Sequence, residues 1–111
     1  MLDNMEPMEK DLNRITDEGL CDLAAAGEKS AEEALVLRYA RLVRMCTRPF
    51  FLAGGDSEDL IQEGMLGLLT AIREFRPDRG ARFTTYAQVC GRRRIISAVR
   101  AAAAEIGRAH V

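Results

Sequence analysis

The fold of this chain is decided by residues 56–100, which read DSEDLIQEGMLGLLTAIREF, then RPDRGAR, then FTTYAQVCGRRRIISAVR. In the first part, apolar side chains recur every three or four residues, which predicts an amphipathic helix with carboxylates on its outer side. The residue types of RPDRGAR are typical of a turn. The last part combines aromatic side chains with several arginines. We therefore expect two consecutive helices, one composed for a protein partner and one for nucleic acid.

Helices are also predicted for the N-terminal half of the chain. The hydroxyl of Thr16 can cap a first helix, and Gly27 marks its end. Ser30 and Glu33 have the spacing of a capping box that opens a second helix. Pro49 is expected to kink, break or end that second helix, because proline has no amide hydrogen to donate.

Two further helices are predicted in the C-terminal half. The third is expected to be capped by Asp56 or Ser57, and the fourth to run from near Thr84 or Thr85 to about Ala104. The residues expected to face the core are Ile61, Met65, Leu68, Ile72 and Phe75 on the third helix and Tyr86, Val89, Ile96 and Val99 on the fourth. No segment shows the alternating pattern of a strand. The predicted fold class is therefore all-α: a compact bundle of about four helices, with no sheet.

A chain of 111 residues is expected to form one domain. Residues 1–15 predict a mobile acidic leader, and residues 16–104 the helical core domain. Residues 105–111, EIGRAHV, match the translation of a common sequencing-adapter DNA, so we expect this tail to be non-native. A natural tail is the alternative. In either case we assign no chemistry to His110.

Composition narrows the class of protein. With 48% hydrophobic and 30% charged residues, the chain is typical of a soluble globular protein. No apolar run approaches the ~20 residues that span a bilayer. The three cysteines form no C-x-x-C pair, which argues against a zinc site or a disulfide framework. We therefore expect a cytoplasmic protein without a metal, a cofactor or contact with a membrane.

Charge is divided unevenly along the chain. Residues 1–63 carry 14 acidic and 7 basic side chains, whereas residues 64–111 carry 3 and 9. Such an asymmetry points to a nucleic-acid-binding surface in the second half. The alternative is that the charges of a helical protein are uneven by chance.

The third predicted helix carries the first candidate site. Four of its residues lie three or four positions apart and so share one face: Asp59, Gln62, Glu63 and Leu66. Carboxylates and an amide around an apolar side chain are typical of a protein–protein contact, and a solvated acidic face is the alternative. Gly64 and Gly67 on the same helix favour a close approach of another helix. Paired carboxylates also serve acid–base catalysis, but no His, Lys or Ser accompanies them, so we do not expect an enzyme.

The second candidate site lies before and within the fourth predicted helix. Aromatic rings and arginines that alternate over residues 75–87 suit single-stranded nucleic acid, in which bases stack on rings and arginines neutralise phosphates. The alternative is that the rings belong to the core, and this is preferred for Phe75. Further along, Arg93, Ser97 and Arg100 share one helix face that can reach phosphates and base edges of a duplex. For that face, a solvated basic surface is the alternative.

Two phrases of this sequence resemble the second conserved region of bacterial RNA polymerase sigma factors: D-L-I-Q-E-G at residues 59–64 and R-G-A-R-F-T-T-Y-A at residues 79–87. The sporulation-type sigma-H group is most similar, because Cys90 and Ile95-Ile96 stand where that group has the same residue types. The resemblance implies that the third helix binds the clamp helices of the largest polymerase subunit. It also implies that the fourth helix and the preceding turn recognise and melt the promoter −10 element, chiefly on the non-template strand.

By position, the resemblance assigns two sets of contacts. The implied polymerase contacts are Asp59, Gln62, Glu63, Met65 and Leu69. The implied DNA contacts are Arg79, Arg82, Phe83, Tyr86, Arg92, Arg93, Ser97 and Arg100. Within the second set, Arg93 is expected to read a base, whereas Arg92 and Arg100 are expected to bind phosphates.

The sequence departs from housekeeping sigma factors at two places. Those proteins have an aromatic residue at the position of Ala81 and a Trp-Trp pair at that of Val89-Cys90. Val and Cys cannot stack on the fork of an opened duplex as Trp does. We therefore expect weaker melting and more selective promoter reading than a housekeeping sigma factor shows.

The resemblance also bears on partners and on completeness. An anti-sigma factor is a further partner that it implies. No helix-turn-helix for the −35 element is present, so we expect the chain to be a fragment of a sigma factor. Two alternatives stay open: a helical interaction module or adaptor that binds polymerase without recognising DNA, and an unrelated small DNA-binding regulator.

Overall fold

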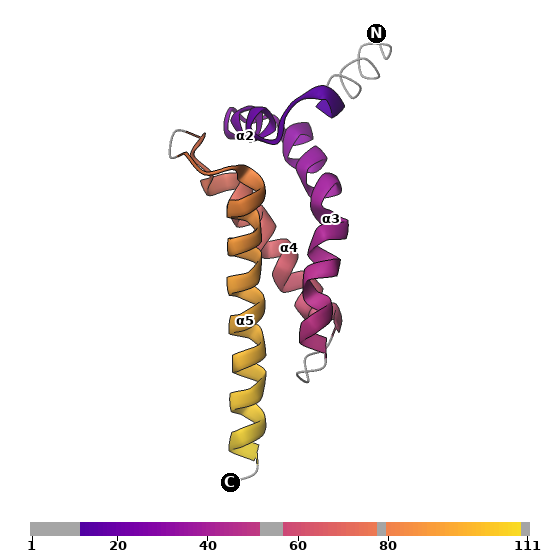
Figure 1. Ribbon diagram of the computed structural model, residues 1–111, viewed down its shortest axis with the longest axis vertical. Helices are drawn as coiled ribbons and strands as arrows, with labels where there is room; N and C mark the ends of the chain where they lie inside the picture. The colour runs from indigo at the N-terminus through magenta and orange to yellow at the C-terminus, as the bar shows by residue number, and fades with distance from the viewer. Residues whose placement is uncertain (1–11, 52–56, 78–79, 110–111) are drawn as a thin grey trace.

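The computed structural model describes residues 12–51, 57–77 and 80–109 (Figure 1). Most of these residues belong to helices α2 (Asp17–Ala25), α3 (Lys29–Phe51), α4 (Ser57–Glu74) and α5 (Phe83–Ala109). The described ranges contain no strand, so the predicted all-α fold is confirmed. In Figure 1, α4 crosses between α3 and α5, and α2 lies over the ends at which α3 and α5 begin.

Both ends of α2 are formed as predicted. The hydroxyl of Thr16 accepts a hydrogen bond from the amide of Gly19 at 3.1 Å, which is the geometry of an N-terminal cap. After the helix the chain turns at Gly27, whose φ of 102° is costly for residues with a side chain. The amide of Glu28 then donates to the carbonyl of Leu23 at 3.0 Å and so closes the helix end.

The predicted limits of α3 need two corrections. The helix begins at Lys29 and not after a cap at Ser30, because the amide of Ala31 already donates to the carbonyl of Glu28 at 3.1 Å. It also continues unbroken through Pro49. Pro49 removes one backbone hydrogen bond from α3, and the helix as described ends two residues later, at Phe51.

The limits of α4 and α5 are close to those predicted. Helix α4 begins at Ser57, so Ser57 is its first residue and not its cap, and the other expected cap, Asp56, lies outside the described residues. Helix α5 begins at Phe83, one residue before the predicted start, and continues to Ala109, past the predicted end at Ala104.

Residues 12–15, which the sequence assigns to a mobile leader, are part of the packed structure. Leu12 and Ile15 pack against the core. Their carbonyls accept hydrogen bonds from the Arg38 guanidinium at 3.3 and 3.1 Å. The rest of the predicted leader, residues 1–11, lies outside the described part of the chain.

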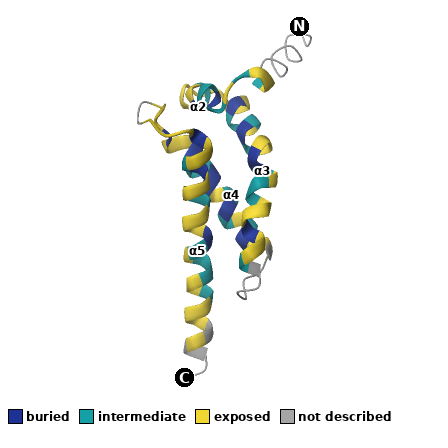
Figure 2. Cartoon of the chain, viewed as in Figure 1, coloured by how far each residue is buried: buried dark blue, intermediate teal, exposed yellow. Residues whose placement is uncertain are grey.

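The core lies where α2, α3, α4 and the first half of α5 meet, and the buried positions in Figure 2 mark it. Its members are Leu20, Cys21, Ala31, Leu35, Tyr39, Leu68, Ala71, Ile72, Phe75, Phe83 and Ala87. On α4, the burial predicted for Leu68, Ile72 and Phe75 is confirmed. Ile61 and Met65 are only partly buried, at the edge of the same face.

The core face predicted for α5 is wrong. The buried residues are Phe83, Ala87 and Ile95, whereas Val89 is 41% exposed. The other predicted members, Tyr86, Ile96 and Val99, are only partly buried. The helix is therefore rotated so that Phe83, Ala87 and Ile95 are buried and Gly91 meets Gly67 of α4, while Tyr86 packs at the edge of the core.

Glycines explain this rotation. A Cβ on Gly67 of α4 would lie 2.8 Å from the Cα of Gly91 on α5, which is closer than van der Waals contact. A Cβ on Gly64 would lie 2.7 Å from Cγ1 of Val43 on α3. The close approach predicted for these glycines is thus confirmed, and it brings α4 against both neighbouring helices.

Candidate protein and nucleic-acid interfaces

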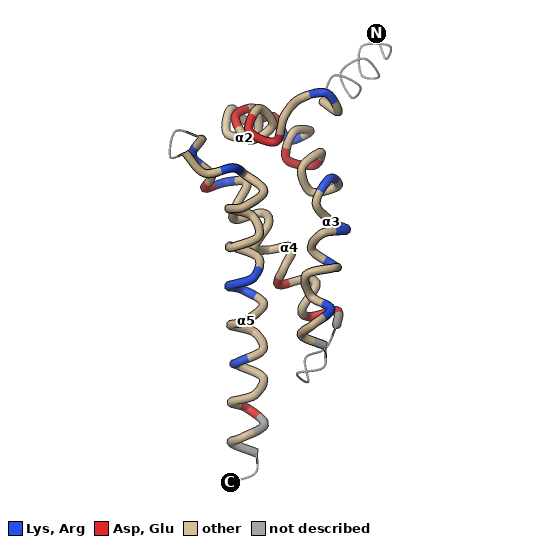
Figure 3. Tube along the Cα trace, viewed as in Figure 1, with Lys and Arg blue, Asp and Glu red and all other residues tan. Residues whose placement is uncertain are grey.

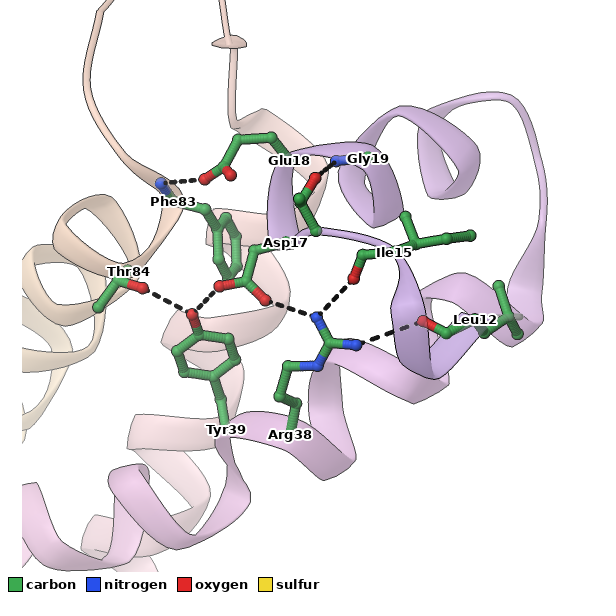
Figure 4. A network of polar contacts seen from close by, with 10 residues as sticks. Leu12, Ile15, Asp17, Glu18, Gly19, Arg38, Tyr39, Phe83 and Thr84 are labelled. Carbon is green, nitrogen blue, oxygen red and sulfur yellow. Dashed lines mark hydrogen bonds and ion pairs between the residues drawn. The ribbon is translucent and has the colours of Figure 1, made fainter. Parts of the chain in front are cut away.

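A cluster of polar contacts fixes the start of α5 (Figure 4). The carboxylate of Glu18 accepts a hydrogen bond from the amide of Phe83 at 2.9 Å, and a negative charge at this helix end is favourable. The hydroxyl of Tyr39 donates to the carboxylate of Asp17 and lies 2.7 Å from the hydroxyl of Thr84. We call these five residues the α5 clasp. Through the clasp, the acidic first turn of α2 stabilises the start of α5 as well as the start of α2.

Burial raises the pKa of two groups, Tyr39 of the clasp and Cys21 of the core. Desolvation, followed by the hydrogen bond to Asp17, raises the pKa of Tyr39 to about 12. Desolvation, with smaller contributions from nearby carboxylates, raises the pKa of Cys21 to about 12. A thiol that stays protonated is a poor nucleophile and metal ligand. Among the described residues, no group of His, Cys, Asp and Glu side chains could hold a metal ion.

The first candidate surface lies on the solvent side of α4. We call it the α4 outer face, and it consists of Asp59, Gln62, Glu63 and Leu66. Glu63 is partly buried, whereas the other three are exposed, and Leu66 is 45% exposed. A shallow groove beside this face is lined by small residues of α5: Ala98, Ala101 and Ala102. The sequence-predicted contacts Met65 and Leu69 are both partly buried.

The second candidate surface lies on the middle of α5, where Figure 3 shows basic residues gathered. We call Arg92, Arg93, Ser97 and Arg100 the α5 basic face, and all four are exposed. Of the three consecutive arginines, Arg94 forms an ion pair with Glu63, with 3.3 Å between Nε and Oε2. Within the described ranges, no side-chain hydrogen bond or ion pair is formed by Arg92, Arg93 or Arg100. Their charges are therefore available to a partner.

The aromatic side chains before and within α5 form a cluster of rings in edge-on and tilted contact. Phe83 is 0% exposed, and its ring meets those of Tyr39 and Phe75 edge-on, at centroid distances of 5.4 and 5.5 Å. Tyr86 is partly buried and lies 5.7 Å from Phe75. Tyr86 therefore lies at the edge of this ring cluster, whereas Phe83 is enclosed by it.

Two arginines of the turn complete the set of residues predicted to bind DNA. Arg82 is exposed at the start of α5, whereas Arg79 lies outside the described residues. The structure therefore brings Arg82 and Tyr86 to one end of α5 and the α5 basic face to its middle.

Sequence reasoning missed two contacts that shape these surfaces. The bond from Phe83 to Glu18 joins residues 65 positions apart, and the pair between Arg94 and Glu63 joins residues 31 positions apart. No local pattern marks either contact, because each depends on how helices cross. The only available signal was that three arginines in a row cannot all find internal partners.

None of the helices in the described part of the chain has an apolar stretch long enough to cross a membrane.

One family model and several curated proteins are similar to this chain. Residues 35–105 match the family model described as Sigma-70 region 2. The RNA polymerase sigma-H factor of Bacillus licheniformis is 38% identical over 89 residues, which are 80% of this chain and 40% of that protein. The sigma-H factor of Bacillus subtilis is 37% identical over 89 residues, or 80% of this chain and 41% of that protein.

A more distant relative matches a shorter part of the chain. The RNA polymerase sigma factor RpoS of Coxiella burnetii is 44% identical over 61 residues, which are 55% of this chain and 17% of that protein. The present chain thus spans about 40% of the length of the sigma-H proteins that it matches.

Proposed function

The chain belongs to the sigma-70 region 2 family, and from this premise we propose that it binds RNA polymerase and recognises and melts the promoter −10 element, as part of a sigma-H-like alternative sigma factor. It would do so without covalent chemistry. The observation that carries the proposal is the pair of accessible surfaces on two tightly packed helices, one acidic and partly apolar on α4 and one basic on α5.

We propose that the α4 outer face binds the clamp helices of the largest polymerase subunit. Its support is chemical: exposed Asp59 can accept and exposed Gln62 can accept or donate hydrogen bonds, and exposed Leu66 offers an apolar contact one turn further along the helix. A mixed surface of this kind suits a partner that is both basic and apolar. Met65 and Leu69, which the family resemblance also assigns to this contact, would contribute through their exposed parts.

We propose that the α5 basic face binds the upstream part of the −10 element while it is still duplex. Arg93 and Ser97 would reach base edges in the major groove, and Arg92 and Arg100 would bind phosphates on either side. The absence of internal partners for these arginines, within the described residues, supports this role. An arginine already paired would have to lose that pair before it bound DNA.

The opened non-template strand would bind at the other end of α5. There Arg82 and Arg79 would neutralise phosphates and the partly exposed ring of Tyr86 would stack on a base. We assign Phe83, which is 0% exposed, the role of supporting Tyr86 through the ring of Phe75. A direct contact between Phe83 and DNA stays a prediction of the family resemblance.

A pull-down with purified core polymerase tests the first contact. The double variant Gln62→Ala/Glu63→Arg should lose binding, because it removes an amide and reverses a charge on the α4 outer face. Glu33→Arg is a matched control, since Glu33 is exposed on α3 and reverses the same charge away from this face. Circular dichroism should show that all proteins stay helical. Equal binding by the double variant and the wild type would contradict the proposal.

Cross-linking tests the DNA contact and separates the sigma factor from the adaptor. The free chain should bind a −10 oligonucleotide weakly, because residues 1–63 carry a net negative charge that repels DNA. With polymerase present, cross-links to the non-template strand should form at the −10 element. Polymerase binding without such cross-links would favour the adaptor, and tight sequence-specific binding by the free chain would favour an independent DNA-binding regulator.

A further inference from the structure

One ion pair connects the two proposed surfaces. Glu63 belongs to the α4 outer face, and Arg94 is the third of the consecutive arginines on α5. Their atoms Oε2 and Nε lie 3.3 Å apart, and the side chains of Arg94 and Glu63 are 43% and 34% exposed. The pair therefore spans the α4–α5 crossing at the surface of the molecule.

The three consecutive arginines point in different directions because each residue of a helix is rotated by about 100° from the one before. Arg92 borders the groove between α3 and α5. Arg93 and Arg94 line a shallow depression together with Glu63 and Ser97. Arg94 thus lies next to the residues proposed to read bases, but its charge is neutralised from α4.

The same carboxylate has two uses. In the proposed function, Glu63 meets a basic surface of polymerase, whereas in the free chain it holds Arg94. An ion pair with this exposure is worth only about 0.2–1 kcal/mol, so a cationic partner of Glu63 can displace Arg94. Arginine binds phosphate oxygens through several N–H groups, and a released Arg94 would have that ligand within the proposed DNA-binding surface.

We propose that Arg94 is an additional phosphate-binding residue that Glu63 keeps occupied in the free chain and that polymerase binding releases to DNA. This inference rests on the proposed function. It adds a physical link between the two surfaces: engaging the α4 outer face would add one positive charge to the α5 basic face. Polymerase and DNA would therefore bind cooperatively through one exchanged ion pair.

The free chain gives the first test, with a short fluorescent DNA duplex at low ionic strength. Glu63→Gln should tighten binding about 1.4-fold to fivefold and steepen the dependence of log K on log salt concentration by about 0.9, the value for one phosphate contact. Arg94→Gln should have the affinity of the wild type, and the double variant Glu63→Gln/Arg94→Gln should lose the gain. A gain that persists in the double variant would overturn the proposal.

A second ion pair supplies the matched control. Arg73 on α4 and Glu32 on α3 also lie 3.3 Å apart, so Glu32→Gln removes the same charge and frees an arginine away from α5. It should change DNA binding by less than half of the effect of Glu63→Gln. An equal effect would mean that only the net charge of the chain matters, and the proposal would fail.

The assembled polymerase complex gives the second test, which does not depend on binding by the free chain. On a promoter duplex, Arg94→Gln should lower the salt dependence of the complex by about 0.9 relative to the wild type. An unchanged salt dependence would overturn the proposal for Arg94 while the proposed function stood. Loss of promoter binding by the wild-type complex would instead contradict the proposed function itself.

Discussion

The start of α5 and the exposed side chains along its middle differ in what surrounds them. At its start, the amide of Phe83 is bonded to Glu18, and the Phe83 ring is enclosed by rings from α3 and from the end of α4. Along its middle, the side chains of Arg93 and Arg100 are exposed and form no hydrogen bond or ion pair with the described residues. The start is therefore specified by the fold, and the middle is left available. Helix α5 is thus fixed to the bundle at its start and carries exposed positive charges along its middle.

This difference has a consequence for mutation. Replacing a buried residue at the start of α5 should alter the stability of the whole bundle, because several helices meet there. Replacing an exposed arginine along the middle of α5 should alter binding and leave stability nearly unchanged. The same helix should thus give two classes of variant.

The largest effect is expected for Phe83→Ala. Removing a fully buried ring leaves a cavity, so the free energy of unfolding should fall by about 3–5 kcal/mol. Urea denaturation followed by circular dichroism measures the change. Val89→Ala on the same helix, where Val89 is 41% exposed, is the control and should change it by about 0.5 kcal/mol or less. If the two variants are equally stable, the start of α5 is not part of the core.

Arg93→Gln should give the next largest effect, on specificity and not on stability. If Arg93 reads a base edge, glutamine should change the preferred base at the upstream edge of the −10 element by about 1–3 kcal/mol. Transcription from a randomised promoter library, with the variant placed in a complete sigma factor, measures this preference. A uniform loss over all promoters would mean that Arg93 binds only phosphate.

A smaller effect is expected where the clasp loses a hydroxyl. Tyr39→Phe removes the hydrogen bond to Asp17 and should cost about 1 kcal/mol at neutral pH. Because the pKa of Tyr39 rises from 10.0 to about 12 on folding, folding favours its protonated form. Its contribution is complete below pH 10 and is lost as the pH rises toward 12.

The wild type should therefore lose stability between pH 10 and 12 more steeply than Tyr39→Phe. Unfolding by urea at a series of alkaline pH values measures both slopes. Cys21, whose pKa is also raised, contributes equally to the two proteins and cancels in the comparison. Identical slopes would show that Tyr39 ionises as freely in the folded chain as in the unfolded one.

How far the sequence predicts this fold depends on the range of the contact concerned. The start of α2 at Thr16 and its end at Gly27 were predictable, because a cap and a positive φ are local properties. The continuation of α3 past Pro49 was not, because the cost of the lost hydrogen bond is set against tertiary packing of the helix, which the local sequence does not show. The close helix crossings were predictable from Gly64 and Gly67.

The orientation of α5 could not be predicted from its own residues. Periodicity favoured a core face of Tyr86, Val89, Ile96 and Val99, since these apolar residues recur every three or more positions. The actual face is set by Gly67 of α4, because a Cβ there would lie 2.8 Å from the Cα of Gly91 and the two backbones approach closely at this point. Only the position of a helix distant in sequence reveals that a glycine, and not a valine, faces inward.

The candidate site divides in the same way. Exposure of Asp59, Gln62 and Arg93 followed from helical spacing and charge. The enclosure of Phe83 did not, because a ring beside arginines looks the same in sequence whether it stacks on bases or on other rings. The pair between Glu63 and Arg94 also depends on the crossing of α4 and α5, which no local pattern encodes.

The smallest effect on stability is expected at the other end of the comparison, for Arg100→Ala. Arg100 is exposed and, within the described residues, makes no ion pair, so the free energy of unfolding should change by about 0.5 kcal/mol or less. If Arg100 binds a phosphate, all promoters should weaken by a similar factor, and the slope of log K against log salt concentration should fall by about 0.9. Arg41→Ala, an equally exposed change on α3, should leave that slope unchanged. A loss of stability comparable to that of Phe83→Ala would mean that Arg100 is as much a part of the core as Phe83. The contrast between the start of α5 and the exposed side chains along its middle would then fail.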